Sequence, residues 1–272
     1  MRGCGLTERA LVLAHYHSHG AIRSDTLQLL TAALDHCNRV MLVSTKLESA
    51  ERTRVPSGVE IQIRENIGYD FYSYRHGMQQ LLSDRGPPLD EICLMNSSFI
   101  CLEADRFLDR LFRTSPGRAD CFGLVRSLEI AEHIQSYVVV LRRRALLDPL
   151  VRNWWANMVP INERNRVVLE YEIGLSQLLL RLGYRIEPAY DHLARISDDV
   201  LRLSRETNVS AVELNARLNP SHFHWLDLLR EFSTLKIEVY RSNQFGLALQ
   251  PLIQLARTDA RVRQLLEEGL EN

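Results

Sequence analysis

The sequence predicts an α/β fold: a mixed, mainly parallel sheet flanked by helices, followed by a helical C-terminal part. Two observations carry this prediction. Short runs of strand-forming residues alternate with longer segments of helical spacing in the first hundred residues, and from about Asp198 onward the apolar residues keep a helical spacing. Strands that alternate with helices indicate parallel pairing, with the helices covering the faces of the sheet. A chain of 272 residues with 46% hydrophobic residues is long enough for such a domain.

The N-terminal third supplies the expected parallel strands and the helices between them. Ser24-Asp25 is typical of a helix start, so a helix is expected over Thr26–His36. A second helix is expected over Tyr72–Ser83. The expected strands are Ala10–Ala14, Val40–Ser44, Val59–Ile63 and Glu91–Met95.

The remaining elements are shorter or wholly helical. Gly183 is a plausible C-terminal stop for a long helix. The expected strands are Cys121–Val125, Tyr137–Leu141 and Tyr184–Pro188. The expected helices are Ala104–Phe112, Arg142–Asn157, Val168–Leu182, Asp198–Glu206, Ser210–Leu218, Ser221–Phe232 and Leu249–Glu268.

The overall composition excludes several classes of function. A net charge of −1, from 33 basic and 34 acidic residues, argues against bulk nucleic-acid binding. The five cysteines are an odd number without CxxC spacing, which indicates buried thiols in a reducing compartment. No signal peptide and no apolar run long enough to span a membrane are found, so a cytoplasmic protein is expected, with peripheral attachment to the inner membrane left open. The simple dehydrogenase, P-loop, hydrolase and zincin motifs are absent.

A polar turn follows the strand expected at residues 59–63. Asn66, Gly68 and Asp70 lie where that strand gives way to a helix. Glycine allows the backbone to turn tightly or to approach a ligand closely, and the two polar side chains can bond the base or ribose of a nucleotide. Capping of the helix start is the alternative for Asn66 and Asp70. Polar groups at the ends of neighbouring strands are where an open α/β sheet gathers a ligand.

Small polar residues also follow the strand expected at residues 91–95. Asn96, Ser97 and Ser98 can bond phosphate oxygens, although a turn cap is the alternative. They include no carboxylate, and Mg²⁺ and Mn²⁺ prefer carboxylate ligands. The sequence therefore favours a metal-independent site, or one that depends on basic residues, and leaves a divalent metal as the less favoured alternative.

Glu172 is the expected general base. It lies near the start of a helix, where the helix dipole keeps a carboxylate ionised, and Glu170 is the reserve. An ionised carboxylate can accept a proton from a hydroxyl.

Further residues are expected to bind a nucleotide sugar because they flank strands. His15 and Tyr16 follow the first strand, and Thr45 follows the second. A metal site at the alternating His15, His17 and His19 is disfavoured, because no cysteine or carboxylate lies beside them. His133 and Gln135 precede a later strand and Arg142 follows it, where an arginine could counter a diphosphate; a solvated charge run is the alternative for Arg142–Arg144.

Several segments together resemble the rhamnan synthesis F-type family of polysaccharide-assembly glycosyltransferases. The similarity runs from about Leu11 to Phe245 and depends on the order and spacing of the segments. The matching segments are Glu65–Tyr74, Leu94–Ser98, His133–Arg142, Tyr171–Gln177, Asn219–Trp225 and Lys236–Arg241. The resemblance implies a GT-A-like fold, with a catalytic and nucleotide-sugar-binding domain at residues 1–195 and a helical extension packed on it at residues 196–272.

The resemblance also implies a reaction and its partners. It implies transfer, with inversion, from a nucleoside diphosphate sugar, with a rhamnose-like deoxyhexose favoured, to a polysaccharide or lipid-linked glycan. Relatives often carry Asn-Asp-Ser where this chain has Asn96-Ser97-Ser98, so the missing aspartate puts metal dependence and activity in doubt. A non-catalytic nucleotide-sugar-binding or scaffold protein of the same fold is therefore the alternative, and a nucleotidyltransferase is a weaker one.

Overall fold

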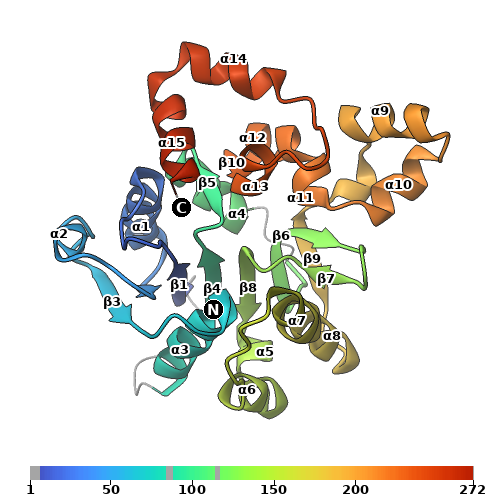
Figure 1. The fold of residues 1–272 in the computed structure, drawn as a ribbon. Coiled ribbons are helices and arrows are strands. Elements are labelled where there is room, and N and C mark those ends of the chain that lie inside the picture. Colours follow the sequence, from blue (N-terminus) through green and yellow to red (C-terminus); the bar gives the residue numbers. More distant parts are fainter. Residues whose placement is uncertain (1–6, 84–87, 114–116, 272) are drawn as a thin grey trace, which may run out of the picture.

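The computed structural model describes residues 7–83, 88–113 and 117–271. Its core is an eight-stranded sheet in the order β3-β2-β1-β4-β8-β6-β7, with β9 paired to β6 (Figure 1). β1, β2, β3 and β4 pair in parallel, as does β9 with β6, whereas β8 is antiparallel to both β4 and β6. The strands are β1 (Arg9–His15), β2 (Arg39–Ser44), β3 (Val59–Ile63), β4 (Glu91–Asn96), β6 (Cys121–Ser127), β7 (His133–Ile134), β8 (Val138–Arg142) and β9 (Ile186–Tyr190). The predicted mixed, mainly parallel α/β sheet is confirmed.

Helices cover both faces of this sheet. α1 (Ser24–His36), α4 (Ala104–Arg113) and α12 (Trp225–Phe232) pack on the face that carries Leu11 and Leu13. α3 (Tyr69–Ser83), α6 (Pro149–Ala156) and α8 (Gly174–Arg181) pack on the face that carries Val12. Successive side chains of a strand point to opposite faces, and central strands buried on both faces are uniformly apolar. This is why the sequence shows continuous apolar runs.

Two of the predicted long helices are interrupted. In each, an aspartate caps the N-terminus of the helix that follows the interruption. The expected helix over 142–157 is wrong: Arg142 ends β8, and α5 (Arg143–Leu146) is separate from α6. The Asp148 carboxylate accepts the N–H groups of Leu150 and Val151 at 2.7 and 3.2 Å, with proline in the first turn of α6. The expected helix over 249–268 is likewise divided into α14 (Gln250–Thr258) and α15 (Ala260–Leu270), the second capped by Asp259.

The helix that carries Glu172 starts earlier than the sequence predicts. α7 (Arg164–Val167), a π-helical segment (Val168–Ile173) and α8 follow one another without a break. Glu172 therefore lies inside a helix rather than at its N-terminus, and the dipole argument for this residue is wrong. A π-helical segment places a side chain differently from a regular helix and occurs often at functional sites. Gly183, with φ +75°, follows the helix as predicted.

The C-terminal part adds a short strand and further helices beside β4. β10 (Thr234–Lys236) pairs antiparallel with β5 (Phe99–Cys101), with Lys236 opposite Phe99. Neither three-residue strand was predicted. The helices α9 (Asp198–Thr207), α10 (Ala211–Arg217) and α11 (Pro220–Phe223) precede β10 in the chain, and α13 (Ile237–Arg241) follows it. The boundary between residues 195 and 196 as a domain border stays a prediction.

Two further features concern the chain as a whole. Cys37, Cys93, Cys101 and Cys121 are buried free thiols, while Cys4 lies outside the described residues. Within the described ranges, no helix combines the length and the apolar character that crossing a bilayer requires.

Candidate active site

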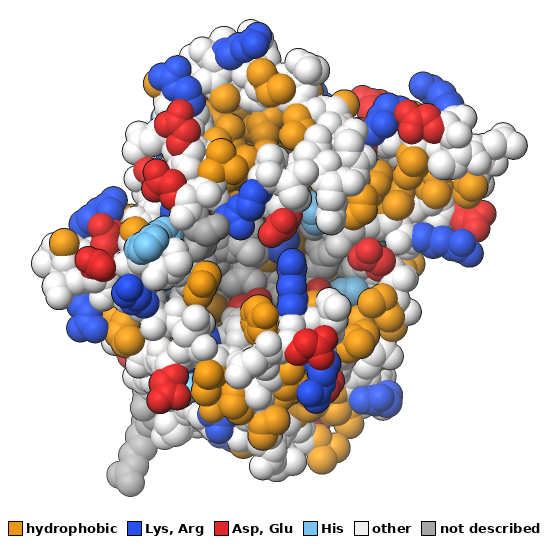
Figure 2. Space-filling view, in the orientation of Figure 1, with side chains coloured by type: hydrophobic (Ala, Val, Ile, Leu, Met, Phe, Trp, Pro, Cys, Tyr) orange, Lys and Arg blue, Asp and Glu red, His pale blue; other side chains and the backbone are white. Residues whose placement is uncertain are grey.

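A cavity of about 600 Å³ opens at the carboxyl ends of β1 and β4. Its other walls are the turn before α3, the helix that begins at α7, and the segment from β10 into α13. Figure 2 shows a hollow in the middle of this face, with basic and acidic side chains gathered around it. The volume suits a small ligand, and this edge of an open α/β sheet is where such ligands bind.

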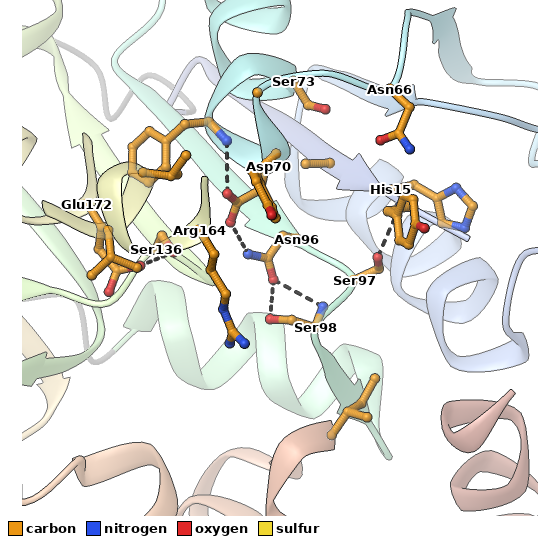
Figure 3. Close-up of a pocket in the computed structure, with 18 of the residues that line it drawn as sticks. His15, Asn66, Asp70, Ser73, Asn96, Ser97, Ser98, Ser136, Arg164 and Glu172 are labelled. Carbon is orange, nitrogen blue, oxygen red and sulfur yellow. Dashed lines mark hydrogen bonds between the residues drawn. The ribbon is translucent and has the colours of Figure 1, made fainter. Parts of the chain in front are cut away.

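Most of the predicted site residues meet in this cavity. Asp70 of α3, Asn96 of β4 and Glu172 of the π-helical segment all line the cavity (Figure 3). The other predicted residues that line it are His15, Tyr16, Asn66, Gly68, Ser97 and Ser98. Their shared location is established by the geometry, while their roles remain predictions.

Arg142 is at the wrong end of the sheet. Because β8 runs antiparallel to β4, its last residue lies opposite Glu91, the first residue of β4. The Arg142 guanidinium pairs with the Glu91 carboxylate at 3.0 Å. A diphosphate in the cavity is therefore out of reach of Arg142, and the prediction that it binds the nucleotide sugar is corrected.

Three other predicted residues do not line the cavity. The Thr45 backbone N–H donates to the His15 carbonyl at 3.3 Å, so Thr45 supports His15 from the position that follows β2. The Gln135 side chain donates to Asn219 at 3.1 Å. Nε2 of His133 lies 3.3 Å from the Glu172 carboxylate. None of these three side chains lines the cavity.

The turn before α3 is held in an unusual backbone conformation. Gly68 has φ +72°, and a Cβ there would lie 2.7 Å from the Cβ of Tyr72, so only glycine fits. Tyr69 also has positive φ, 53°, and its exposed ring lines the cavity. The buried Arg64 guanidinium donates to the backbone carbonyls of Glu65, Ile67 and Tyr69. These bonds hold the turn so that Asp70 faces β4.

A chain of hydrogen bonds links this turn to the C-terminal part. The Asn96 amide donates to the Asp70 carboxylate at 2.6 Å. The Asn96 side-chain oxygen accepts from the Ser98 N–H at 3.1 Å and from its hydroxyl at 2.5 Å. The Lys236 ammonium then donates to the Ser98 hydroxyl oxygen at 2.9 Å. Burial, followed by the charge of Glu172, raises the pKa of Asp70.

Glu172 is held by two donors. The Ser136 hydroxyl donates to one of its oxygens, and Nε2 of His133 lies 3.3 Å from the other. Burial by itself would raise the pKa of Glu172, but the bonds from His133 and Ser136 and the charges of His133 and Lys236 outweigh it, and the pKa is lowered. Glu172 is therefore an ionised carboxylate in a buried wall.

The protonation state of His133 follows from its other nitrogen. Nδ1 lies 2.8 Å from the carbonyl oxygen of Ala131, which can only accept, so Nδ1 carries a proton. A second proton on Nε2 would be donated to Glu172, whose oxygen lies 3.3 Å away. Burial lowers the pKa of His133, but the bond and the charge of Glu172 outweigh burial and raise it. The raised pKa of His133 and the lowered pKa of Glu172 both favour the pairing of an imidazolium with a carboxylate.

His15 is neutral at the end of β1. Its Nδ1 lies 2.8 Å from Oγ of Ser44, whose own hydroxyl donates to the Lys46 carbonyl at 2.6 Å, so Nδ1 is the donor. Burial, together with the charge of Arg23, lowers the pKa of His15 to about 4. His15 therefore offers a fixed, uncharged ring to the cavity.

Three cationic residues that line the cavity escaped prediction, and one of them, Arg241, donates to the Gly269 carbonyl at 2.7 Å. Arg164 is the first residue of α7, and its side chain extends into the cavity (Figure 3). Lys236 ends β10. The resemblance of Lys236–Arg241 to the family's closing segment was a signal that could have pointed to Lys236. No local pattern marked Arg164, because the helix was expected to begin four residues later.

The donor set at the strand ends does not fit a divalent cation. Over the described part of the chain, no three His, Cys, Asp or Glu side chains gather as a metal site. Asn96 already uses both side-chain atoms, and the Lys236 ammonium lies beside Ser98. A positive charge at this place repels a metal ion rather than holding one.

Comparisons with known proteins find curated relatives of low identity. Two curated relatives are each 24% identical to this chain. One is the uncharacterized protein y4gN of Sinorhizobium fredii, over 203 residues that make up 73% of this chain and 51% of the relative. The other is virulence protein VirA of Vibrio anguillarum, over 196 residues, 67% of this chain and 62% of the relative. The chain thus spans between half and two thirds of the length of these relatives.

Solved structures resemble the chain only distantly. The glycosyltransferase GlyE of Streptococcus pneumoniae has 12% identity and a TM-score of 0.39, over 79% of this chain and 52% of GlyE. The mannosyltransferase PcManGT of Pyrobaculum calidifontis, solved with GDP-Man and Mn²⁺, has 10% identity and a TM-score of 0.43, over 97% of this chain and 87% of its own.

The match to a protein family is more direct. Residues 40–211 match the family described as rhamnan synthesis protein F. This region is well over half of the chain and contains the turn before α3, the end of β4 and the helix that carries Glu172. The chain therefore belongs to the rhamnan synthesis protein F family.

Proposed function

We propose that this protein is an inverting glycosyltransferase. It would move a sugar from a nucleoside diphosphate donor to a hydroxyl group of a polysaccharide acceptor, with a rhamnose-like deoxyhexose as the favoured sugar. Family membership supports the broad class. The observation that carries the proposal is one cavity in which an ionised carboxylate, Glu172, faces the polar ends of β1 and β4.

The donor nucleotide would occupy the side of the cavity formed by β1 and the turn before α3. Asn66 would bond the ribose or base, and the neutral His15 would lie against the nucleotide. Tyr16 and Tyr69 are 47% and 46% exposed and both line the cavity, so their rings offer stacking surfaces for a base. Ser97 and Ser98 would bond the diphosphate.

Glu172 would act as the general base. It would take the proton of the acceptor hydroxyl while that oxygen forms a bond to the anomeric carbon. The bond from the anomeric carbon to the diphosphate oxygen would break, and its electron pair would leave with the diphosphate. A single displacement of this kind inverts the anomeric centre. His133 and Ser136 keep Glu172 ionised until the proton arrives.

A non-catalytic role in the same family is the second candidate. Asn96-Ser97-Ser98 contains no carboxylate, and the Lys236 ammonium lies beside Ser98, so a metal-dependent transfer is not supported. A protein that binds a nucleotide sugar without transferring it would keep the cavity and dispense with the base. The glycosyltransferase proposal also includes a cytoplasmic location and contact with a lipid-linked glycan at a membrane surface.

A ligand screen followed by one substitution tests the proposal. Thermal unfolding with EDTA present, against nucleoside diphosphates and their sugars, should show a raised melting temperature for the donor. Release of the nucleoside diphosphate from that sugar, with water or an added glycan as acceptor, should then be measured for the wild type and for Glu172→Gln. The variant should keep donor binding and lose about 100- to 10,000-fold in rate, as expected for removal of a general base.

The outcomes separate the candidates. Normal turnover by Glu172→Gln would remove Glu172 as the base. Binding of a nucleotide sugar without any turnover by the wild type would favour the non-catalytic role. Absence of a thermal shift with every nucleotide would contradict both.

A further inference from the structure

We propose that Lys236 and Arg164 form a diphosphate-binding site, in which the Lys236 ammonium carries the charge that a metal ion would otherwise supply. This inference rests on the proposed function and extends it. It places the C-terminal segment inside the site, because Lys236 lies beyond the matched residues 40–211.

The surroundings of Lys236 leave most of its hydrogen-bonding capacity unused. Its ammonium donates to Ser98 Oγ at 2.9 Å and lies 4.4 Å from the centre of the Tyr137 ring. An ammonium group has three donors. In the described part of the chain, Lys236 has no carboxylate partner within 4 Å. A partly buried ammonium without an adjacent anion is costly, so this arrangement favours an anion in the cavity.

The carboxylates that face Lys236 are committed elsewhere. Asp70 accepts from Asn96, and Glu172 is bound by His133 and Ser136. Burial lowers the pKa of Lys236, although Glu172 and Asp70 act in the opposite direction. A diphosphate that reaches the cavity would add negative charge beside the ammonium and raise this pKa.

Arg164 supplies a second positive charge from the helix that begins at α7. The residue is exposed and lines the same cavity, and its side chain has neither a hydrogen bond nor an ion pair with any residue that the structure describes. Figure 3 shows its guanidinium on the side of the cavity where Ser98 lies. A guanidinium binds two oxygens of a phosphate at once, whereas an ammonium is a compact point charge. The two groups are therefore complementary: Arg164 can grip the outer oxygens and Lys236 can stabilise the departing one.

The chain's use of lysine makes this position unusual. Of 33 basic residues only two are lysines, Lys46 and Lys236. Lys46 is exposed and does not line the cavity. Its ammonium donates a long hydrogen bond to the Ser18 carbonyl at 3.5 Å. Lys46 therefore provides a matched control, and the scarcity of lysine allows Lys236 to be observed directly.

Calorimetry with EDTA present tests the site through binding alone. UDP, GDP, dTDP, CDP, ADP and the matching nucleosides should be titrated into the wild type, Lys236→Met, Lys236→Arg and Lys46→Met. Methionine keeps the apolar stem and removes the charge. For the nucleotide that binds, Lys236→Met should weaken diphosphate affinity about 10- to 100-fold, as for loss of a charge-assisted hydrogen bond. Affinity for the nucleoside should not change, Lys46→Met should behave as wild type, and Lys236→Arg should not restore full affinity in the confined site.

Nuclear magnetic resonance supplies the second measurement. Reductive ¹³C-methylation labels the two lysines, and saturating diphosphate should shift the Lys236 signal and raise its pKa while the Lys46 signal stays in place. Equal diphosphate affinity of Lys236→Met and wild type, or an unmoved Lys236 signal, would overturn the inference and leave the proposed function standing. No binding of any nucleotide by the wild type would overturn both. Thermal unfolding of each variant separates a loss of fold from a loss of binding.

Discussion

The two ends of the central sheet both gather charged residues, but the run Arg142–Arg144 at one end is paired with carboxylates, whereas Lys236 and Arg164 at the other end have no carboxylate within 4 Å among the described residues. At the amino end of β4, a shallow pocket of about 360 Å³ is lined by three consecutive arginines, Arg142–Arg144. Each has a carboxylate partner: Glu91 at 3.0 Å, Asp90 at 3.5 Å and Asp120 at 3.0 Å. At the carboxyl end, Lys236 and Arg164 face a cavity without such partners among the described residues.

This difference shows that local charge density is a poor guide to an anion site. The run Arg142–Arg144 is the densest basic feature near a strand. Its charges are nevertheless paired with carboxylates at the amino end of β4. Carboxylates that already occupy a guanidinium compete with any incoming phosphate. Lys236 and Arg164 at the cavity, by contrast, keep hydrogen-bonding capacity open. The comparison therefore predicts that substitutions at one end change binding and at the other change stability.

The largest effect on binding among the substitutions that compare the two ends is expected at the cavity end, for Arg164→Gln. Because this side chain has no partner in the described residues, its loss should leave the melting temperature unchanged. It should weaken nucleoside diphosphate binding about tenfold, the lower range for a charge-assisted hydrogen bond at an exposed position. Calorimetry and thermal unfolding measure the two quantities. A fall in melting temperature with unchanged affinity would reverse the assignment of the two ends.

The next effect is expected at the opposite end, for Arg142→Gln. The guanidinium donates to Glu91 and, at 2.8 Å, to the Ala119 carbonyl. Glu91 is buried and also pairs with Arg9 at 2.7 Å, so one partner would remain. The free energy of unfolding should fall by about 1–3 kcal/mol, the cost of leaving buried groups partly unsatisfied. Denaturant unfolding checks the loss, and nucleotide affinity should stay at the wild-type value.

These two ends also show what the sequence could and could not predict. Asp70 and Asn96 were found because apolar runs locate parallel strands well, and polar residues at their ends share one edge. Arg142 was misplaced because nothing in a strand's composition shows that it runs antiparallel to its neighbour. The reversal of β8 moves its last residue to the far edge of the sheet.

The remaining misses have equally physical causes. Lys236 meets Ser98 across 138 residues of sequence, through the pairing of two three-residue strands that are too short for a recognisable pattern. Glu172 was placed at the cavity for the wrong reason. The sequence suggested a helix start, whereas a π-helical segment inside a longer helix presents this side chain. Hydrogen-bonding partners such as His133 and Ser136 then keep it ionised, which no local rule anticipates.

A smaller effect, visible in its pH dependence, is expected for His133→Gln. The raised pKa of His133 means that its pairing stabilises the fold fully below its ordinary value of 6.5 and is lost as pH rises through the folded value. The lowered pKa of Glu172 stabilises the fold above its ordinary value of 4.5 and is lost as pH falls through the folded value. The variant should therefore lose most stability between pH 4.5 and 6.5. Denaturant unfolding at several pH values measures this window.

The same variant should also move the acid limb of the rate profile. Without the imidazolium, the pKa of Glu172 rises, so nucleoside diphosphate release should decline at a higher pH than in the wild type. A stability loss that is equal at all pH values, with an unmoved acid limb, would show that His133 acts by packing alone.

The smallest effect is expected for Arg144→Gln, which tests whether the paired end is uniform. The Arg144 side chain is 64% exposed and reaches Asp120 at 3.0 Å, while Asp120 also accepts the Arg185 N–H at 3.0 Å. Solvent screens an exposed pair of this kind, so the free energy of unfolding should fall by less than about 1 kcal/mol. Nucleotide affinity should match the wild type. A measurable loss of affinity would mean that charge at this end reaches the ligand after all, and that pairing with carboxylates does not separate the two ends.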